Sequence, residues 1–188
     1  MTPQSAPVRL DHVAIDGQPV IETERLCLRP MRRSDMGLID LYAGDVRVAE
    51  MTTSIPHPLP PGTTDTFVTR TLSGENSETI WIMDAEAAGL GELVGLIGLQ
   101  PMDRGQAEIG YWVAPMVWNT GLATEALRAL MEANPLGCAQ VFGKVFQDNP
   151  ASARVLTNSG FDYIGDAEAY CPARGSVQPQ WTYIRQMA

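Results

Sequence analysis

The chain has 188 residues, 45% of them hydrophobic, which is enough for one globular domain with a substantial core. Its net charge of −9, from 13 Lys and Arg against 22 Asp and Glu, argues against a nucleic-acid partner, which requires a basic surface. Three scattered cysteines without Cys-x-x-Cys spacing argue against disulfides and a metal site. No apolar run reaches the ~18 residues of a membrane span. The N-terminus lacks the features of a signal peptide, so we expect a cytoplasmic protein without a membrane partner.

The N-terminal part is predicted to contain a leader and one strand. Residues 1–19 are polar and contain proline, which is typical of a loosely ordered leader. Residues 20–188 are expected to form a single domain. Alternating side chains over residues 21–29 predict a strand that Pro30 ends.

Two helices are predicted next. Ser34 and Asp35 are expected to cap the first, and Thr63 or Thr64 the second, because small polar side chains accept hydrogen bonds from the first helical N–H groups. Between them, four prolines in residues 51–61 exclude a helix or a central strand.

The rest of the chain predicts a mixed sheet. Three strands in hairpin order are followed by a strong amphipathic helix, a strand, a shorter helix and two strands around an irregular loop. The order favours an α+β (or α/β) mixed sheet with helices on both faces. The predicted strands are 79–84, 92–100, 106–114, 139–146, 161–169 and 180–185, and the helices are 121–134 and 149–158.

The most informative segment is the loop over residues 118–124, between a predicted strand and the strong helix. Gly121 and the small Ala123 allow close approach of a ligand to backbone N–H groups at the start of the helix. Such donors, with the positive end of the helix dipole, favour phosphate binding. The alternative is an ordinary strand-to-helix turn capped by Asn119 or Thr120.

Two further patterns carry polar side chains beside this loop. Alternation places Glu108 on the same strand face as Trp112 and opposite to Tyr111. A carboxylate facing a cleft there is suited to accept a proton from an ammonium, the alternative being a solvated strand residue. Asn149 and Ser152 share a face on the first turn of the second helix, as ligand contacts or as a helix cap.

Together these segments resemble the GNAT N-acetyltransferase family, and within it the RimJ/RimL type of ribosomal-protein N-terminal acetyltransferase. The resemblance covers residues 21–186. It implies the GNAT fold, with about seven mostly antiparallel strands and a splayed strand pair. The residues that carry it are Thr23-Glu24-Arg25-Leu26, Leu28-Arg29-Pro30, Glu108-Ile109-Gly110-Tyr111-Trp112, Gly121-Leu122-Ala123-Thr124-Glu125-Ala126, and Asn149-x-x-Ser152-x-x-Val155-Leu156-x-x-x-Gly160-Phe161.

The resemblance implies acetyl-CoA as co-substrate, without a metal. The loop would donate to the pyrophosphate, the strand before it would pair with the pantetheine arm, and the second helix would line the exit of the thiol. The N–H of Val113 or Ala114 would polarise the thioester carbonyl. The implied co-substrate-binding residues are Trp112, Val113, Ala114, Trp118, Asn119, Thr120, Gly121, Leu122, Ala123, Thr124, Asn149 and Ser152.

The resemblance also implies direct acetyl transfer to a primary amine, either a small molecule or a protein N-terminus, by a monomer or homodimer. Glu108 occupies the position of the family's base, and Ser152 that of the proton donor to the leaving thiolate. The chain departs from the family pattern at Leu156, where many members have tyrosine, and at Asn119, where the type has glycine. The alternative function is a non-catalytic acyl-CoA-binding module.

Overall fold

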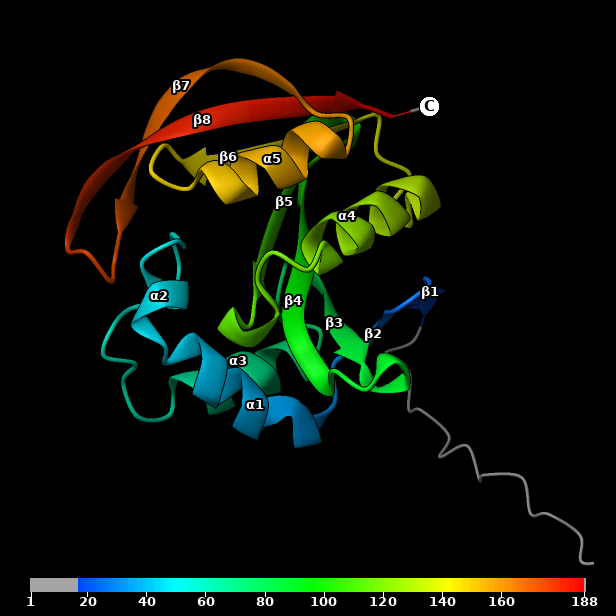
Figure 1. The fold of residues 1–188 in the computed structure, drawn as a ribbon, viewed down its shortest axis with the longest axis vertical. Coiled ribbons are helices and arrows are strands. Elements are labelled where there is room, and N and C mark those ends of the chain that lie inside the picture. Colours follow the sequence, from blue (N-terminus) through cyan, green and yellow to red (C-terminus); the bar gives the residue numbers. More distant parts are fainter. Residues whose placement is uncertain (1–16, 188) are drawn as a thin grey trace, which may run out of the picture.

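One mixed sheet organises residues 17–187, the part of the chain that the computed structural model describes. Within this part eight strands lie in the order β1-β2-β3-β4-β5-β6-β8-β7, and every neighbouring pair is antiparallel except β5 and β6 (Figure 1). The predicted mixed α+β sheet is confirmed. The strands are β1 (Ile21–Glu22), β2 (Cys27–Pro30), β3 (Thr79–Ala85), β4 (Gly91–Met102), β5 (Gln106–Val113), β6 (Gln140–Phe146), β7 (Asp162–Cys171) and β8 (Ser176–Gln186).

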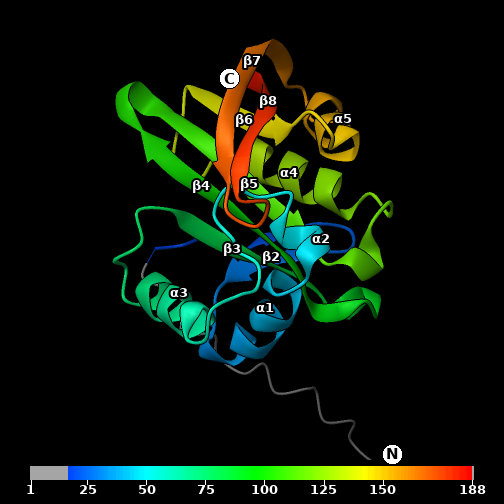
Figure 2. The ribbon, with the colours of Figure 1, turned by 90° about the vertical axis from the view of Figure 1, so that its left-hand side faces the viewer.

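Helices cover both faces of the sheet, as predicted. One face packs against α1 (Met36–Ala43) and α3 (Thr63–Leu72), and the other against α4 (Leu122–Ala133) and α5 (Pro150–Asn158) (Figures 1 and 2). The short helix α2 (Val46–Ala49), which the sequence analysis missed, follows α1. Two apolar clusters result, one on each face of the sheet.

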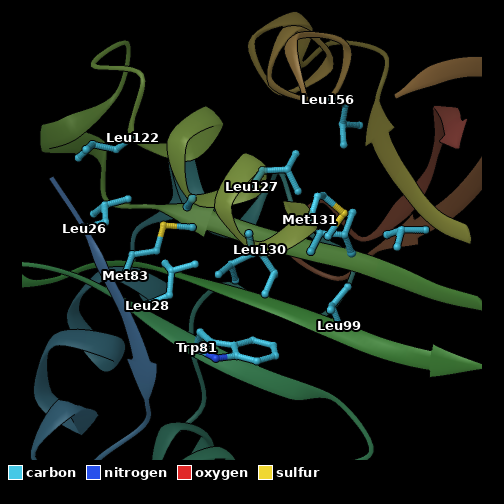
Figure 3. Close-up of a cluster of buried hydrophobic side chains, with 14 of the residues drawn as sticks. Leu26, Leu28, Trp81, Met83, Leu99, Leu122, Leu127, Leu130, Met131 and Leu156 are labelled. Carbon is cyan, nitrogen blue, oxygen red and sulfur yellow. The ribbon is translucent and has the colours of Figure 1, made fainter. Parts of the chain in front are cut away.

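The larger cluster lies between the sheet and α4. The predicted amphipathic face of α4 is confirmed, because its leucines and Met131 are buried against sheet residues such as Trp81 and Leu99 (Figure 3). Leu156 of α5 extends the same cluster toward β6. Burial of this much apolar surface is the main force that holds the helical layer on the sheet. It also fixes the start of α4 above the carboxyl end of β5.

The strand predicted over residues 21–29 is wrong as one element. Thr23 N–H donates to the Leu26 carbonyl (2.8 Å), and Leu26 N–H donates to Thr23 Oγ1 (2.9 Å). This turn reverses the chain, so that β1 pairs with β2 and Ile21 lies opposite Leu28. Side-chain alternation is the same in a hairpin as in a straight strand, which is why the pattern did not reveal the turn.

Two other predictions need correction. Neither Thr63 nor Thr64 caps α3: Gly62, at φ +82°, precedes the helix, and Thr64 donates its hydroxyl to Asp40 (2.6 Å). The irregular loop predicted between the last two strands is a tight turn, because β7 and β8 extend into one long hairpin. The predicted leader over residues 1–19 lies outside the described residues except for residues 17–19.

A buried cation ties the N-terminal segment to the sheet. Arg29 of β2 donates two hydrogen bonds to Asp35 (2.9 Å each) and one to Asp84 of β3 (2.7 Å). Burial disfavours the charged guanidinium, but these carboxylates outweigh that cost and the pKa of Arg29 is raised. Asp35 occupies the predicted cap position before α1, but the predicted side-chain cap is wrong: its carboxylate accepts from Arg29 and from the Arg32 N–H, and Ser34 lies in the preceding 3-10 turn.

Arg29→Ala is expected to lower the free energy of unfolding by about 3–5 kcal/mol, because two carboxylates lose their buried partner. Denaturant unfolding measures the loss. Arg33→Ala is the control: its pair with Asp65 is exposed, with a separation of 3.8 Å, and contributes about 0–1 kcal/mol. Equal, small losses for both variants would contradict the buried role.

Candidate active site

A cleft of about 1140 Å³ joins the segments that the sequence analysis singled out. The loop over 118–124 lines one end, β5 and the start of α5 line the middle, and α3 with residues 51–59 line the other end. Glu108 and all of the predicted co-substrate-binding residues except Ala114 and Thr120 contribute to its walls. One continuous space therefore connects the predicted phosphate loop to the predicted base.

The loop before α4 holds its backbone in left-handed conformations. Asn119 has φ +61° and Gly121 has φ +85°. The turn-capping alternative is wrong: Gly121 itself occupies the cap position without a side-chain bond, and the Thr120 hydroxyl donates to the Val117 carbonyl (2.6 Å). The first helical bond runs from Glu125 N–H to the Gly121 carbonyl (3.0 Å), so the preceding N–H groups are left open at the helix start.

An ion pair holds this helix start in place. Glu125 of α4 accepts hydrogen bonds from the Arg25 side chain and main chain (2.7 Å each) and from Thr23 (2.6 Å). Arg25 also donates to the Thr120 carbonyl (2.9 Å). Burial opposes the charge of Glu125, but these hydrogen bonds and Arg25 lower its pKa on balance. Arg25 thus compensates the one acidic side chain in the first turn of α4.

Strands β5 and β6 separate beside this loop. They pair only from Gln106 with Gln140 to Ile109 with Gly143, whereas β5 stays paired with β4 as far as Val113. The N–H of Ala114 donates to the Val94 carbonyl (2.8 Å), so it is already used. Because groups on a strand alternate in direction, the N–H and carbonyl of Val113 face the gap. There the Trp118 indole N–H donates to the Val113 carbonyl (2.7 Å).

The first turn of α5 faces β5 across the cleft. Asn149 Oδ1 accepts a hydrogen bond from Ser152 N–H (3.2 Å), and Pro150 is the first helical residue, so the helix-cap interpretation is confirmed. The Ser152 hydroxyl lies 2.8 Å from the Tyr111 hydroxyl, a partner that the sequence analysis missed. Tyr111 also donates to the Ser152 carbonyl (3.3 Å). Leu156, at the family's tyrosine position, is buried in the core.

Tyr111 is held in its neutral form. Burial raises its pKa to about 12, although the hydrogen bond with Ser152 acts in the opposite direction. The side chain projects from the face of β5 opposite to Glu108, as alternation predicted. It therefore reaches α5 while Glu108 faces the other side of the sheet.

Glu108 forms an ion pair with Lys144 of β6 (2.7 Å). Both side chains are a little over one-third exposed, so the pair lies at the wall of the cleft. The interpretation of Glu108 as a solvated strand residue is therefore incomplete, because its cationic partner Lys144 lies 36 residues away in the sequence. The second Glu108 oxygen is left for other donors.

A second carboxylate, Glu78, lines the same cleft and was missed by the sequence analysis. It immediately precedes β3, and its side chain lies over Gly98 of β4 and beside Gly110 of β5. Burial, and then the negative charge of Glu108, raise the pKa of Glu78. No motif marks this residue, because its position depends on the space left by Gly98 on another strand.

The turn between β7 and β8 is tied to the segments that follow α2 and precede α5. Arg174, in the turn between β7 and β8, donates to the Glu50 carbonyl after α2 (2.8 Å) and to Asp148 before α5 (2.6 Å). Its guanidinium also stacks over the Phe146 ring, 5.2 Å from the ring centre. Figure 2 shows the tip of this hairpin beside α2.

Residues 25–162, which contain β5, the loop over 118–124 and α5, match the family model for the acetyltransferase (GNAT) domain. The chain belongs to the GNAT acetyltransferase family. The predicted membership is confirmed, and with it the enzyme class of an N-acetyltransferase. This acetyltransferase is 29% identical over 167 residues to the uncharacterized N-acetyltransferase YoaA of Bacillus subtilis (strain 168), with 84% of this chain and 91% of YoaA covered.

Solved structures share the fold of this acetyltransferase at low identity. RimL, a ribosomal L7/L12 alpha-N-protein acetyltransferase in complex with coenzyme A, has a TM-score of 0.77 and 18% identity over 90% of this chain and 98% of RimL. The spermidine N-acetyltransferase from Vibrio cholerae, in complex with CoA and spermine, has a TM-score of 0.73 and 16% identity, with 88% and 97% covered. At this level of identity, both similarities show that the fold is shared.

Two kinds of structural feature are absent from residues 17–187. No group of three or more His, Cys, Asp or Glu side chains in this range is placed to hold a metal ion. No helix of the same range has the length and apolar character needed to cross a membrane.

Tyr111→Phe is expected to reduce the decrease in the free energy of unfolding that accompanies a rise to alkaline pH. A tyrosine in the unfolded chain ionises near pH 10, whereas folded Tyr111 keeps its proton to about pH 12. The folded state then binds more protons, so stability falls as pH rises between these values, by about 2–3 kcal/mol. Urea unfolding at several pH values checks this. Tyr170→Phe, at an exposed position, should leave the slope unchanged.

Proposed function

We propose that this enzyme transfers the acetyl group of acetyl-CoA to a primary amine by direct attack of the amine nitrogen. The observation that carries the proposal is the single cleft that joins three features. These are the open N–H groups at the start of α4, the free edge of β5, and the carboxylate of Glu108. Each serves a different part of this reaction.

The residues at the donor end fit acetyl-CoA as co-substrate. The N–H groups of residues 119–124, with the positive end of the α4 dipole, are suited to pyrophosphate oxygens. The free edge of β5 is suited to the amides of the pantetheine arm, as an added strand. Val113 offers an N–H toward the gap, whereas Ala114 does not, so we assign the polarisation of the thioester carbonyl to Val113.

The proposed chemistry begins with the amine, because an ammonium has no lone pair. Glu108 accepts the proton, and the nitrogen attacks the thioester carbonyl carbon. The C–S bond then breaks and the electron pair leaves with sulfur as a thiolate, which takes up the second proton that the new amide nitrogen releases. Ser152 donates a hydrogen bond to this thiolate, and the single hydrogen of the Tyr111 hydroxyl, 2.8 Å away, turns from the Ser152 carbonyl to the Ser152 hydroxyl. Tyr111 takes the place of a direct tyrosine donor, since Leu156 has no hydroxyl.

The acceptor is a primary amine, either a protein N-terminus or a small molecule. The relatives support both classes, since RimL is named for a protein substrate and the Vibrio cholerae enzyme for spermidine. The acceptor end of the cleft, between α3 and residues 51–59, is lined by apolar as well as polar side chains. A cytoplasmic location agrees with either class of substrate.

Release of free CoA thiol tests the proposal directly. Acetyl-CoA is added to the protein with a panel of alkylamines, polyamines, aminoglycosides and peptides with free N-termini, and thiol is detected. We expect amine-dependent release from at least one member of the panel. Acetyl-CoA that raises the melting temperature without thiol release from any amine would instead support a non-catalytic acyl-CoA-binding module.

Glu108→Gln is expected to lower kcat on the order of 100-fold, because the amine loses its proton acceptor. The KM for acetyl-CoA should stay unchanged, since Glu108 is remote from the loop before α4. Steady-state kinetics with the best amine of the panel measure both constants. Glu132→Gln, at an exposed position of α4, is the control. An unchanged kcat would remove Glu108 as the base.

A further inference from the structure

Glu78 occupies a position in which its carboxylate takes the space that a side chain at Gly98 would fill. Its carboxylate lies over Gly98, where a Cβ atom would overlap it, and Oε1 is 3.7 Å from the place of a Cβ on Gly110. Gly98 and Gly110 are direct partners in the β4 and β5 pairing. Glu78 therefore crosses the sheet surface on the same face as Glu108, two residues farther along β5 toward Trp112.

The charge of Glu78 is uncompensated in the part of the chain that the structure describes. Within residues 17–187 no hydrogen bond or ion pair reaches its carboxylate, although the side chain is partly buried. The other charged side chains that line the cleft are Glu108 of β5, Lys144 of β6, Arg47 of α2, Arg70 of α3, Arg154 of α5 and Glu168 of β7. Lys144 pairs with Glu108, which itself repels Glu78. A partly buried carboxylate beside a second carboxylate is unfavourable unless a cation joins them.

We propose that Glu78 binds the reacting ammonium group of the acceptor and holds it between Glu78 and Glu108. This inference rests on the proposed function and adds a residue that recognises the substrate. An ammonium has three N–H donors and needs acceptors that no cation already uses. Glu78 and the second oxygen of Glu108 supply them. After one proton passes to Glu108, the neutral amine still donates to Glu78, which turns its lone pair away from that carboxylate.

The first test is Glu78→Gln, measured with the best amine of the panel. At neutral pH the KM for the amine should rise by about tenfold to a hundredfold, because a charge-assisted hydrogen bond is lost. The kcat and the KM for acetyl-CoA should change little. The KM difference should shrink as pH rises above the pKa of the free amine, because a neutral amine is not attracted by charge. Glu75→Gln, an exposed carboxylate nearby, is the control.

A glycine pair offers a second test that keeps the carboxylate. Gly98→Ala should displace Glu78 and reproduce the higher KM for the amine. Gly110→Ala places its Cβ at ordinary contact distance from Glu78 and should have a smaller effect. An unchanged KM in both Glu78→Gln and Gly98→Ala, with amine turnover intact, overturns the proposal and leaves the proposed function standing.

The melting temperature of the Glu78→Gln variant distinguishes a binding role of Glu78 from a structural role. Because the pKa of Glu78 is raised in the folded protein, its charge costs stability above that pKa, and the cost disappears below the pKa of the unfolded chain. Glu78→Gln should therefore raise the melting temperature at neutral pH and leave it unchanged in acid. A lower melting temperature at both pH values, with an unchanged KM, means a structural role and overturns the proposal.

Direct binding distinguishes failure of this inference from failure of the proposed function. n-Butylammonium is titrated into the CoA-loaded protein, and the amide resonances of Gly98 and Gly110 are followed by NMR. Shifts that saturate in the wild type and are lost in Glu78→Gln support the ammonium site, even where no amine is acetylated. Shifts of equal size and midpoint in both proteins, or none in either, contradict it.

Discussion

The end of pairing between β5 and β6 is the constraint on which the site depends. Leu156 of α5 packs against Gly143, where a Cβ would meet its side chain at 2.7 Å, and the pairing of the two strands ends there. Backbone groups inside a sheet are normally satisfied by the next strand. Here β5 keeps β4 on one side and has an open edge on the other, below the start of α4. A ligand with amides and phosphates is the chemical complement of that arrangement.

Local sequence signals predicted the parts of the fold that depend on neighbouring residues. The apolar face of α4 and the Asn149 cap are such parts, because contacts within one turn decide them. Parts that depend on distant residues were not predictable. The ion pair of Glu108 joins residues of two strands that lie 36 positions apart, and Glu78 lies in the space left by Gly98 on another strand. The turn at Thr23 is local but leaves no trace in side-chain alternation.

Charge compensation is uneven around the cleft. In this acidic chain, Arg25 compensates Glu125 near the loop before α4, Lys144 compensates Glu108, and Arg174 compensates Asp148 at the hairpin tip. Among the described residues, two cleft-lining carboxylates join no ion pair: Glu168, which is exposed, and Glu78, which is partly buried. Such a residue lowers the stability of the free protein, and this cost is typical of positions that a protein keeps for binding.

The indole of Trp118 partly covers the open edge of β5. Its N–H donates to the Val113 carbonyl, although the ring itself is 43% exposed. A side chain therefore gives this carbonyl the hydrogen bond that a neighbouring strand would otherwise provide. When the amide of a ligand displaces the indole, one N–H donor replaces another, and the Val113 carbonyl keeps the same number of hydrogen bonds. The indole thereby covers part of the edge that we propose for the pantetheine arm, and it protects this edge against pairing with unrelated strands.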